Sequence, residues 1–394
     1  MKKLLVIGAG FLQDFVIQKA VSLGYETLAV DGDPGAVGFK HAHRSAAINI
    51  VDEKACLEYA KKEGIDGVVT AATDFGILSA AYVARELKLP GLKYEVAQLI
   101  KNKYKVRKCL FEACVDDARQ AFEVDENTDM SLLSQWLAYP VMVKPCDGSG
   151  SRGTGRVDSP TQLADACKYA MNSSLSHRAE IESFILGTEY GVESLVIGGN
   201  VHVLGIMKKW MTKPPYYAEL GHAMPSGLSS ELEKKVKDCV IKAIMALGIN
   251  FGAVNMDILI TSEGGVYIVD VGARMGGNMI GPCIIPYGSG IDYMAALIKS
   301  AVGDPADLTA GESTAVATKL LAFEKGVIKK LPDMEAIAKE YDVEIYHHMA
   351  EGMEVNKYRT NLDGLGYVVA RGSSYIAAEE KAASALERIR QEAF

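Results

Sequence analysis

The sequence has no long apolar run, no paired cysteines and no surplus of basic residues. No apolar stretch reaches the roughly 18 residues that span a bilayer, and Gly8, Gly10 and Asp14 interrupt an N-terminal segment that resembles a signal peptide. A net charge of −8 over 394 residues argues against a general nucleic-acid binder. The seven cysteines form no C-x-x-C pair, which argues against a disulfide framework or a zinc site. We therefore expect a cytoplasmic protein with no membrane or nucleic-acid partner.

The first 92 residues alternate short apolar strands with helices, a pattern typical of a parallel α/β sheet. Residues 8–10 begin the dinucleotide pattern G-x-G-x-x-G, but Gln13 replaces its third glycine, although Asp31 lies where a ribose-binding acid would sit. We interpret the pattern as a tight turn, with an NAD-dependent oxidoreductase as the minor alternative. Asp74 follows a fourth strand, and ligands bind at the carboxyl ends of such strands, so it is a candidate substrate residue.

Two further segments place lysines beside a glycine-rich loop. A basic helix is predicted over residues 93–113 and carries Lys103, and an apolar strand over residues 139–145 carries Lys144. Residues 147–155 follow with four glycines in nine positions, a composition that lets backbone N–H groups close over phosphate oxygens. The loop lacks the G-K-[ST] of a P-loop. Taken alone it could be a hairpin tip, but the neighbouring lysine favours phosphate binding.

Residues 180–192 read as strand, turn and strand, which could offer backbone groups to a flat base and a later carboxylate to a ribose. The loop at residues 213–225 mixes aromatic and charged side chains and includes Glu219 and His222. Such a loop suits a lid over a substrate. An ordinary surface loop is the equal alternative.

Residues 255–277 read as two apolar strands joined by a Gly-Gly turn, with one carboxylate on each strand. If the turn holds four residues, Thr261 pairs with Val266, and Asp257 falls opposite Asp270 on one face of the hairpin. Their Cβ atoms would then lie about 4.5–5.5 Å apart. Two like charges at that separation need a cation between them, and a divalent cation with oxygen ligands is the simplest one. A loop longer by one residue would put them on opposite faces.

In this order the motifs resemble the ATP-grasp superfamily over nearly the whole chain. The resemblance rests on the N-terminal α/β unit and on Lys103, V-M-V-K-P (141–145), the 147–155 loop, E-S-F-I-L-G-T-E (182–189), the acidic hairpin and Arg274. Residues 219–226 and 272–278 are most similar to carboxylate–amine, or amino-acid, ligases. Residues 366–372 also resemble the closing lobe of the purine-biosynthetic and biotin-carboxylase-like branch.

The resemblance implies an α/β protein with the ATP-grasp fold. An N-terminal parallel α/β domain (1–92) would precede a central, two-lobed α+β ATP-binding domain (93–307), whose small lobe covers about 139–200. A small C-terminal α/β lobe (308–394) would complete the chain.

The resemblance also implies a site for ATP with Mg²⁺, or alternatively Mn²⁺. The implied nucleotide-binding residues are Lys103, Lys144, Gly148, Ser149, Gly150, Ser151, Glu182, Ser183, Phe184, Ile185 and Glu189. Asp257 and Asp270 would bind the metal, and Arg274, with Lys144, would be catalytic. The residues expected to contact substrate are Asp74, Glu219, His222 and Asn278.

Two departures from the family pattern concern the metal. Both hairpin acids are Asp where the family usually has Glu, and Gly272 stands where an Asn supplies a third ligand, so water or Asn278 would replace it. The implied activity joins a small-molecule carboxylate to an amine through an acyl phosphate and releases ADP and phosphate. The alternatives are an ATP-grasp enzyme that uses bicarbonate or a purine intermediate, and a non-catalytic nucleotide sensor. The sequence names neither the acid nor the amine, and it neither shows nor excludes a homodimer.

Overall fold

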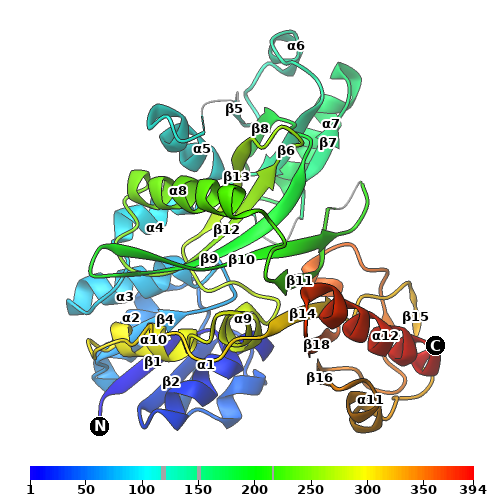
Figure 1. Cartoon of the computed structure of the whole chain (residues 1–394). Helices are drawn as coiled ribbons and strands as arrows, with labels where there is room; N and C mark the ends of the chain where they lie inside the picture. Colours follow the sequence, from blue (N-terminus) through cyan, green and yellow to red (C-terminus); the bar gives the residue numbers. More distant parts are fainter. Residues whose placement is uncertain (117–120, 149–151, 215–216) are drawn as a thin grey trace.

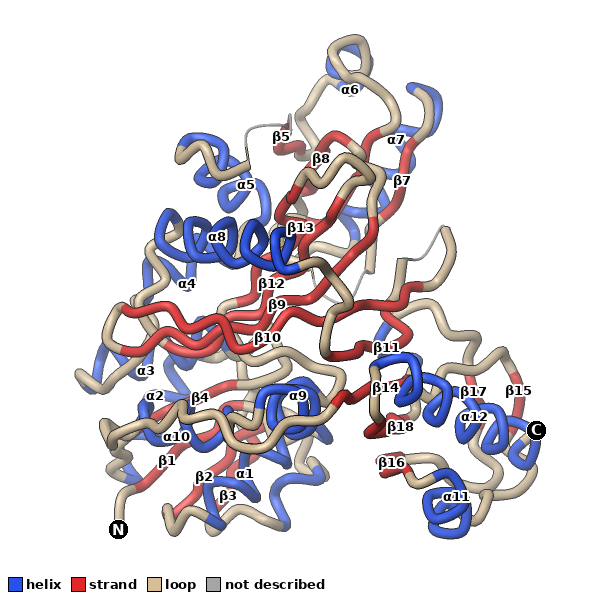
Figure 2. Tube along the Cα trace, in the orientation of Figure 1, coloured by secondary structure: helices blue, strands red, loops and turns tan. Residues whose placement is uncertain are grey.

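The computed structural model describes residues 1–116, 121–148, 152–214 and 217–394 (Figure 1). Long central strands run through the middle of the molecule, and three smaller groups of elements surround them (Figure 2). These groups come from the N-terminal quarter of the chain, from a small sheet within residues 121–183 and from the C-terminal segment (Figure 1). Within the described residues, no helix combines the length and apolar character needed to cross a membrane.

The N-terminal unit is a four-stranded parallel sheet in the order β3-β2-β1-β4. Its elements are β1 (Lys3–Ile7), α1 (Phe11–Ser22), β2 (Glu26–Asp31), the 3₁₀ turn η1 (Val37–Lys40), β3 (Arg44–Ala47), α2 (Glu53–Glu63), β4 (Gly67–Thr70) and α3 (Ile77–Leu87). Strands β1 and β4 are buried almost throughout, as expected for a parallel sheet covered by helices. The predicted α/β alternation is confirmed.

The glycine turn after β1 is closed by contacts within the chain. The Asp31 carboxylate accepts hydrogen bonds from the N–H of Ala9 at 2.8 Å and of Asp33 at 2.9 Å. The side-chain amide of Gln13 donates to the carbonyl of Ala71 at 2.6 Å. Because these contacts occupy Asp31 and Gln13, they favour a tight turn over a dinucleotide site.

The single helix predicted over residues 93–113 is two helices in the structure. They are α4 (Tyr94–Ile100) and α5 (Lys103–Glu112). The Asn102 side chain accepts a hydrogen bond from the Lys105 N–H at 2.9 Å and thereby caps the second helix. The new helix start makes Lys103 its first residue, and the Lys103 N–H donates to the Cys146 carbonyl at 2.7 Å.

A four-stranded sheet in the order β5-β8-β6-β7 forms the small lobe. Its elements are β5 (Ala121–Val124), α6 (Met130–Leu133), β6 (Val141–Pro145), β7 (Gly155–Val157), α7 (Pro160–Asn172) and β8 (Ala179–Ser183). The predicted small lobe, at about 139–200, leaves out β5, although β5 pairs with β8 in this sheet. It also includes β9 (Thr188–Ile197), although β9 pairs with β10 and β12 in the large sheet.

The large sheet has eight strands in the order β13-β12-β9-β10-β11-β14-β18-β16. Besides β9 they are β10 (Asn200–Met211), β11 (Glu219–Met224), β12 (Gly252–Ile260), β13 (Val266–Gly272), β14 (Ala315–Leu320), β16 (Val343–His347) and β18 (Gly366–Gly372). Helix α8 (Ser230–Ala246) shares a core with β12, in which Val236 and Val240 join Val254 and Met256. Because strand side chains alternate, Asp257 projects from the face of the sheet opposite α8.

The C-terminal strands extend the large sheet, since β14 pairs with both β11 and β18. The remaining elements are the π-helix η2 (Ile280–Ile284), α9 (Ile285–Ser289), α10 (Tyr293–Ala301), β15 (Gly326–Val327), α11 (Met334–Tyr341), β17 (Glu354–Val355), the 3₁₀ turn η3 (Asn361–Asp363) and α12 (Tyr375–Ala393). The C-terminal segment is thus joined to the central strands through the sheet. The predicted domain boundaries themselves stay predictions.

Candidate functional site

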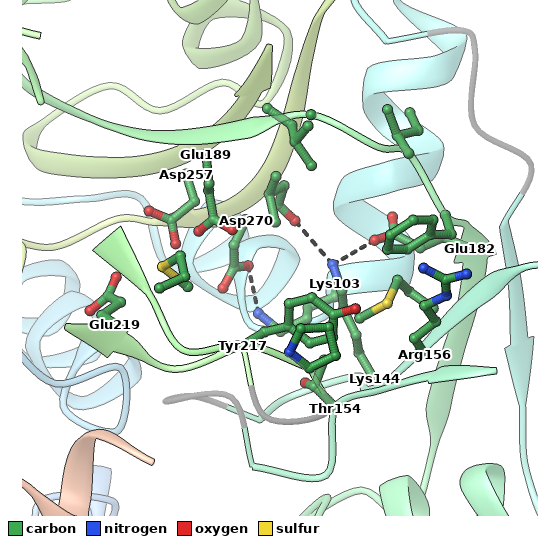
Figure 3. Close-up of a pocket in the computed structure, with 18 of the residues that line it drawn as sticks. Lys103, Lys144, Thr154, Arg156, Glu182, Glu189, Tyr217, Glu219, Asp257 and Asp270 are labelled. Atoms are coloured by element: carbon green, nitrogen blue, oxygen red, sulfur yellow. Dashed lines mark hydrogen bonds and ion pairs between the residues drawn. The ribbon is translucent and has the colours of Figure 1, made fainter. Parts of the chain in front are cut away.

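A cleft of about 420 Å³ lies between the small sheet and one face of the large sheet (Figure 3). The predicted site residues that line it are Lys103, Lys144, Gly148, Glu182, Ser183, Phe184, Ile185, Glu189, Glu219, Asp257 and Asp270. Ser149, Gly150 and Ser151 lie outside the described residues. Arg274, Asp74, His222 and Asn278 do not line this cleft, and their positions are given below.

Asp257 and Asp270 do lie opposite each other, but the register that puts them there is not the predicted one. Ile260, not Thr261, pairs with Val266, so the turn is one residue longer than expected. A β-bulge at Val269 then adds one residue to β13 and restores the pairing of the two acids. Figure 3 shows both carboxylates in the same cleft.

Lysines supply the cations that the paired acids require in this structure. The Lys103 Nζ lies 2.5 Å from Asp270 Oδ1, and the Lys209 Nζ lies 2.8 Å from Asp257 Oδ1. Lys144, on β6, lies 2.5 Å from Glu182 Oε1 (Figure 3). Three lysines from three separate elements therefore meet the carboxylates of the cleft.

Lys209 is a site residue that the sequence analysis missed. Its side chain is fully buried, and its Nζ contacts Glu189 at 2.7 Å, Glu219 at 2.8 Å and Asp257 at 2.8 Å. Burial alone would lower the Lys209 pKa, but the three carboxylates raise it well above its ordinary value. Withdrawal from water raises the pKa of Asp257 to about 7, with Glu189 and Glu219 adding to the effect.

The small lobe supplies an apolar wall beside these charges. Phe184, Ile185 and Leu186 line the cleft with Met142, and the Arg156 guanidinium lies 4.4 Å from the Phe184 ring centre. A wall of this kind suits a flat, aromatic base next to a cluster of cations that suits phosphates.

The donor set at the hairpin fits a cation that completes its coordination with oxygens from outside the protein. Within the described residues, no group of three or more His, Cys, Asp or Glu side chains is arranged to hold a metal. Two carboxylates with phosphate oxygens and water are a usual environment for Mg²⁺. Asp257 and Asp270 are therefore suited to a metal that arrives with a nucleotide.

Residue 272 lies close to Arg274. A Cβ atom placed on Gly272 would lie 3.2 Å from the guanidinium carbon of Arg274, so a side chain there would press on Arg274. Asn278, the predicted replacement, donates its side-chain amide to Glu219 instead. The structure thus brings neither residue 272 nor Asn278 to the two acids.

Arg274 and Asp74 pair with each other beside the cleft. The Arg274 Nε lies 3.0 Å from Asp74 Oδ1, and Nη2 lies 3.3 Å from Oδ2. A parallel bridge between Ala71 and Met275 ties the same two segments together. The predicted substrate residue Asp74 is therefore the ion-pair partner of the predicted catalytic Arg274.

Glu219 is held by residues from distant parts of the chain. Besides Lys209 and Asn278, it accepts a hydrogen bond from the Asn361 amide at 3.1 Å, and the Tyr358 hydroxyl donates to its backbone carbonyl. Asn361 and Tyr358 were missed because nothing in the sequence links them to residue 219.

His222 is buried beside Glu219, with Nε2 3.9 Å from a Glu219 carboxylate oxygen. Burial lowers the His222 pKa to about 4, so the ring is neutral near pH 7. Its Nδ1 has no hydrogen-bond partner in the described part of the chain. The neutral His222 ring therefore adds no charge to the cluster in which Lys209 contacts three carboxylates.

Glu193 is a second buried acid that the sequence analysis missed. It accepts hydrogen bonds from the Tyr293 hydroxyl at 2.5 Å, the Asn255 amide at 2.9 Å and the Gly276 N–H at 3.0 Å. It therefore fixes the loop after Arg274. Burial raises its pKa from 4.5 to about 7.

The raised Glu193 pKa predicts a pH-dependent stability. Between about pH 4.5 and 7 the folded state holds a proton that the unfolded state has released, so stability falls as the pH rises through this window and is level above it. In Glu193→Gln that fall should shrink by about 1–3 kcal/mol. Urea unfolding at pH 5 and pH 7.5 measures it, with the exposed Glu263→Gln as control. Equal pH slopes in Glu193→Gln and the native chain would contradict the prediction.

Two protein-family models match segments that contain many of these site residues. Residues 137–282 match the ATP-grasp domain, and residues 319–393 match the L-amino acid ligase C-terminal domain 2. The first match contains β6, β7 and β8 of the small lobe, the acidic hairpin and Arg274. The second covers the segment that supplies Asn361 and Tyr358.

Individual proteins resemble the whole chain more distantly. An uncharacterized protein, y4rH, of Sinorhizobium fredii is 28% identical over 84% of this chain and 68% of its own length. A formate-dependent phosphoribosylglycinamide formyltransferase of Sulfurisphaera tokodaii is 24% identical over 98% of this chain and 96% of its own. The structure of an L-amino acid ligase from Bacillus licheniformis superimposes with a TM-score of 0.84 at 23% identity, covering 99% of this chain and 98% of that one.

Residues 137–282 therefore form an ATP-grasp domain, as the motif order predicted, and the superposition shows a shared fold over nearly the whole chain. The C-terminal match, over residues 319–393, is to a domain of L-amino acid ligases.

Proposed function

We propose that this chain binds MgATP in the cleft and joins the carboxylate of an amino acid to the amine of a second small molecule. One observation carries the proposal: Lys103, Lys144 and the Asp257–Asp270 pair line a single cleft that also has an apolar wall. The likeness of residues 319–393 to L-amino acid ligases supports amino acids as substrates.

In the proposed reaction, a carboxylate oxygen of the first substrate attacks the γ-phosphorus of ATP, the bond to the bridging oxygen breaks, and ADP leaves. The amine nitrogen then attacks the acyl carbon of the acyl phosphate, loses a proton and expels inorganic phosphate. Both steps depend on positioning and charge neutralisation more than on covalent help from the protein.

Each charged residue has a proposed role in these steps. Lys103 and Lys144 exchange their carboxylate partners for phosphate oxygens, and Glu189 accepts the ribose hydroxyls. Mg²⁺ bound by Asp257 and Asp270 would neutralise phosphate charge. Arg274, which pairs with Asp74, orients the reacting carboxylate.

The predicted substrate residues would surround the amino-acid groups. The Glu219 carboxylate can pair with a substrate ammonium, and His222 and Asn278 flank it. Because Asn361 and Tyr358 reach Glu219 from the C-terminal segment, that segment would share in the choice of substrate.

A phosphate-release screen tests the proposal. The purified chain is incubated with MgATP, one amino acid as the carboxylate and a panel of amino acids and simple amines, and phosphate and ADP are measured. Release that requires both an acid and an amine, with the amide seen by mass spectrometry, is the expected result. No release with any pair, in a chain that binds ATP, would favour a nucleotide sensor.

A second function is favoured by one observation, the 24% identity to a formate-dependent phosphoribosylglycinamide formyltransferase over nearly the full length of both chains. The same screen therefore includes formate, bicarbonate and a purine intermediate. Phosphate release that needs one of these and no amino acid would overturn the amino-acid proposal while keeping the ATP site.

A further inference from the structure

The bulge at Val269 sets the geometry of the acidic hairpin. On the turn side of the bulge Ile258 pairs with Ile268, and on the other side Asp257 pairs with Asp270. Without the extra residue, Asp257 would face Val269, and the neighbouring Asp270 would point to the other side of the sheet. Whatever holds the bulge therefore decides whether the two acids share the cleft.

The bulge lies on β13, an edge strand of the large sheet, and charged side chains satisfy its outer backbone groups. The Arg107 Nη2 donates to the carbonyl of Ile268 at 2.8 Å and lies 3.4 Å from that of Val269. The Asp116 carboxylate accepts from the Ile268 N–H at 3.1 Å. The Lys144 Nζ lies 3.4 Å from the Val269 carbonyl.

Arg107 and Asp116 also bind each other, with Nη1 2.7 Å from Oδ2, and both side chains are buried. Arg107 lies one helical turn after Lys103 on α5, so the two cations lie on one face of that helix. Lys103 contacts the Asp270 carboxylate, and Arg107 contacts the backbone two residues before it. Helix α5 thus contacts both the Asp270 side chain, through Lys103, and the bulge that orients it, through Arg107.

Arg107 connects this grip to the small lobe as well. Its Nε lies 3.1 Å from Glu182 Oε2, and the other oxygen of the same carboxylate lies 2.5 Å from the Lys144 Nζ. The buried Arg107 guanidinium therefore connects β8, which carries Glu182, to β13, which carries Asp270.

We propose that Arg107 and Asp116 are positioning residues that hold the Val269 bulge in register and so keep Asp270 opposite Asp257. The inference rests on the proposed metal role of these two acids. Neither Arg107 nor Asp116 lines the cleft, so their effect would pass through β13. β-Bulges next to active sites commonly re-aim a side chain in this way.

The test measures ADP binding by calorimetry with Mg²⁺ and with EDTA. The ratio of the two dissociation constants gives the contribution of the metal to ADP affinity. Arg107→Lys keeps the charge but cannot contact Ile268, Asp116 and Glu182 together. We expect the gain in ADP affinity that Mg²⁺ confers to fall by about 10- to 100-fold, the range for residues that orient metal ligands. Affinity in EDTA should change by less than about threefold, because Lys103 and Lys144 remain.

Two further variants make the result decisive. Asp116→Asn weakens only the contacts with Ile268 and Arg107, so it should change the ratio of dissociation constants in the same direction but by less. If Arg107→Lys does not fold, Asp116→Asn provides the test. Arg390→Lys makes the same exchange at an exposed ion pair on α12 and should change nothing.

A native Mg²⁺ ratio in folded Arg107→Lys and Asp116→Asn would overturn the proposal, and so would equal losses of affinity with and without Mg²⁺, which is what a purely structural role would give. If ADP binding by the native chain does not depend on Mg²⁺, the metal site itself is wrong, and the inference falls with it. That failure is distinguishable, because it appears before any variant is made.

Discussion

Replacing Asp270 with asparagine should lower ATP turnover by about 100-fold or more and leave the fold intact, because a neutral amide is a poor ligand for a divalent cation. The Asp270 side chain is 43% exposed in the cleft, so loss of its charge removes little that the folded state needs. Lys103 loses its partner in the same variant, but it lies where phosphate would take over. Substrate-dependent phosphate release measures turnover, and urea unfolding checks the fold.

Three companion variants sharpen this result. Asp257→Asn should lose turnover similarly, since the opposite acid is the other proposed ligand. Asp270→Glu introduces the residue that ATP-grasp enzymes usually carry, so it should retain far more turnover than the asparagine variant. Glu263→Gln removes an exposed charge from the turn of the same hairpin and should be neutral. Normal ATP turnover in Asp270→Asn would mean that the metal assignment is wrong.

The fold could be predicted because its signals are local and ordered along the chain. Alternating strands and helices gave the N-terminal sheet, and the succession of lysines, glycine loop and acidic hairpin gave the superfamily. The helix break before Lys103 was missed although Asn102 is a good N-cap, because the basic helical pattern continues across it.

The hairpin shows where local reasoning stops. Its turn length was misjudged by one residue, and the facing of Asp257 and Asp270 was nevertheless correct, because the Val269 bulge compensates. That bulge is held by Arg107 and Asp116, which lie more than 150 residues earlier in the chain. No pattern within the hairpin could have indicated it.

The rest of the site depends on contacts between distant segments. Of the neighbours Lys208 and Lys209, strand alternation requires one to face the cleft but does not say which. The pairing of Arg274 with Asp74 joins residues 200 positions apart. The C-terminal contacts of Glu219 exist because β14 and β18 extend the large sheet, which the sequence reading treated as a separate lobe.

Replacing Lys209 with methionine should destabilise the chain by about 3–5 kcal/mol and abolish measurable turnover, because one ammonium balances three carboxylates at a position that water does not reach. Methionine fills a similar volume, so lost packing contributes little. Lys208→Met is the matched control, since Lys208 points to the other face of β10, where it lies over the Tyr375 ring. That variant should change stability by less than about 1 kcal/mol.

Charge, rather than the lysine's shape, is the reason for the expected loss, and a second substitution separates the two. Adding Asp257→Asn to Lys209→Met removes one of the carboxylates left without a cation, so stability should recover in part. Turnover should not recover, because Asp257 is a proposed metal ligand. If the double variant is no more stable than Lys209→Met, the electrostatic account of Lys209 is wrong, and its contribution is one of packing. If Lys209→Met itself is as stable as the native chain, the three carboxylates are balanced by something other than Lys209.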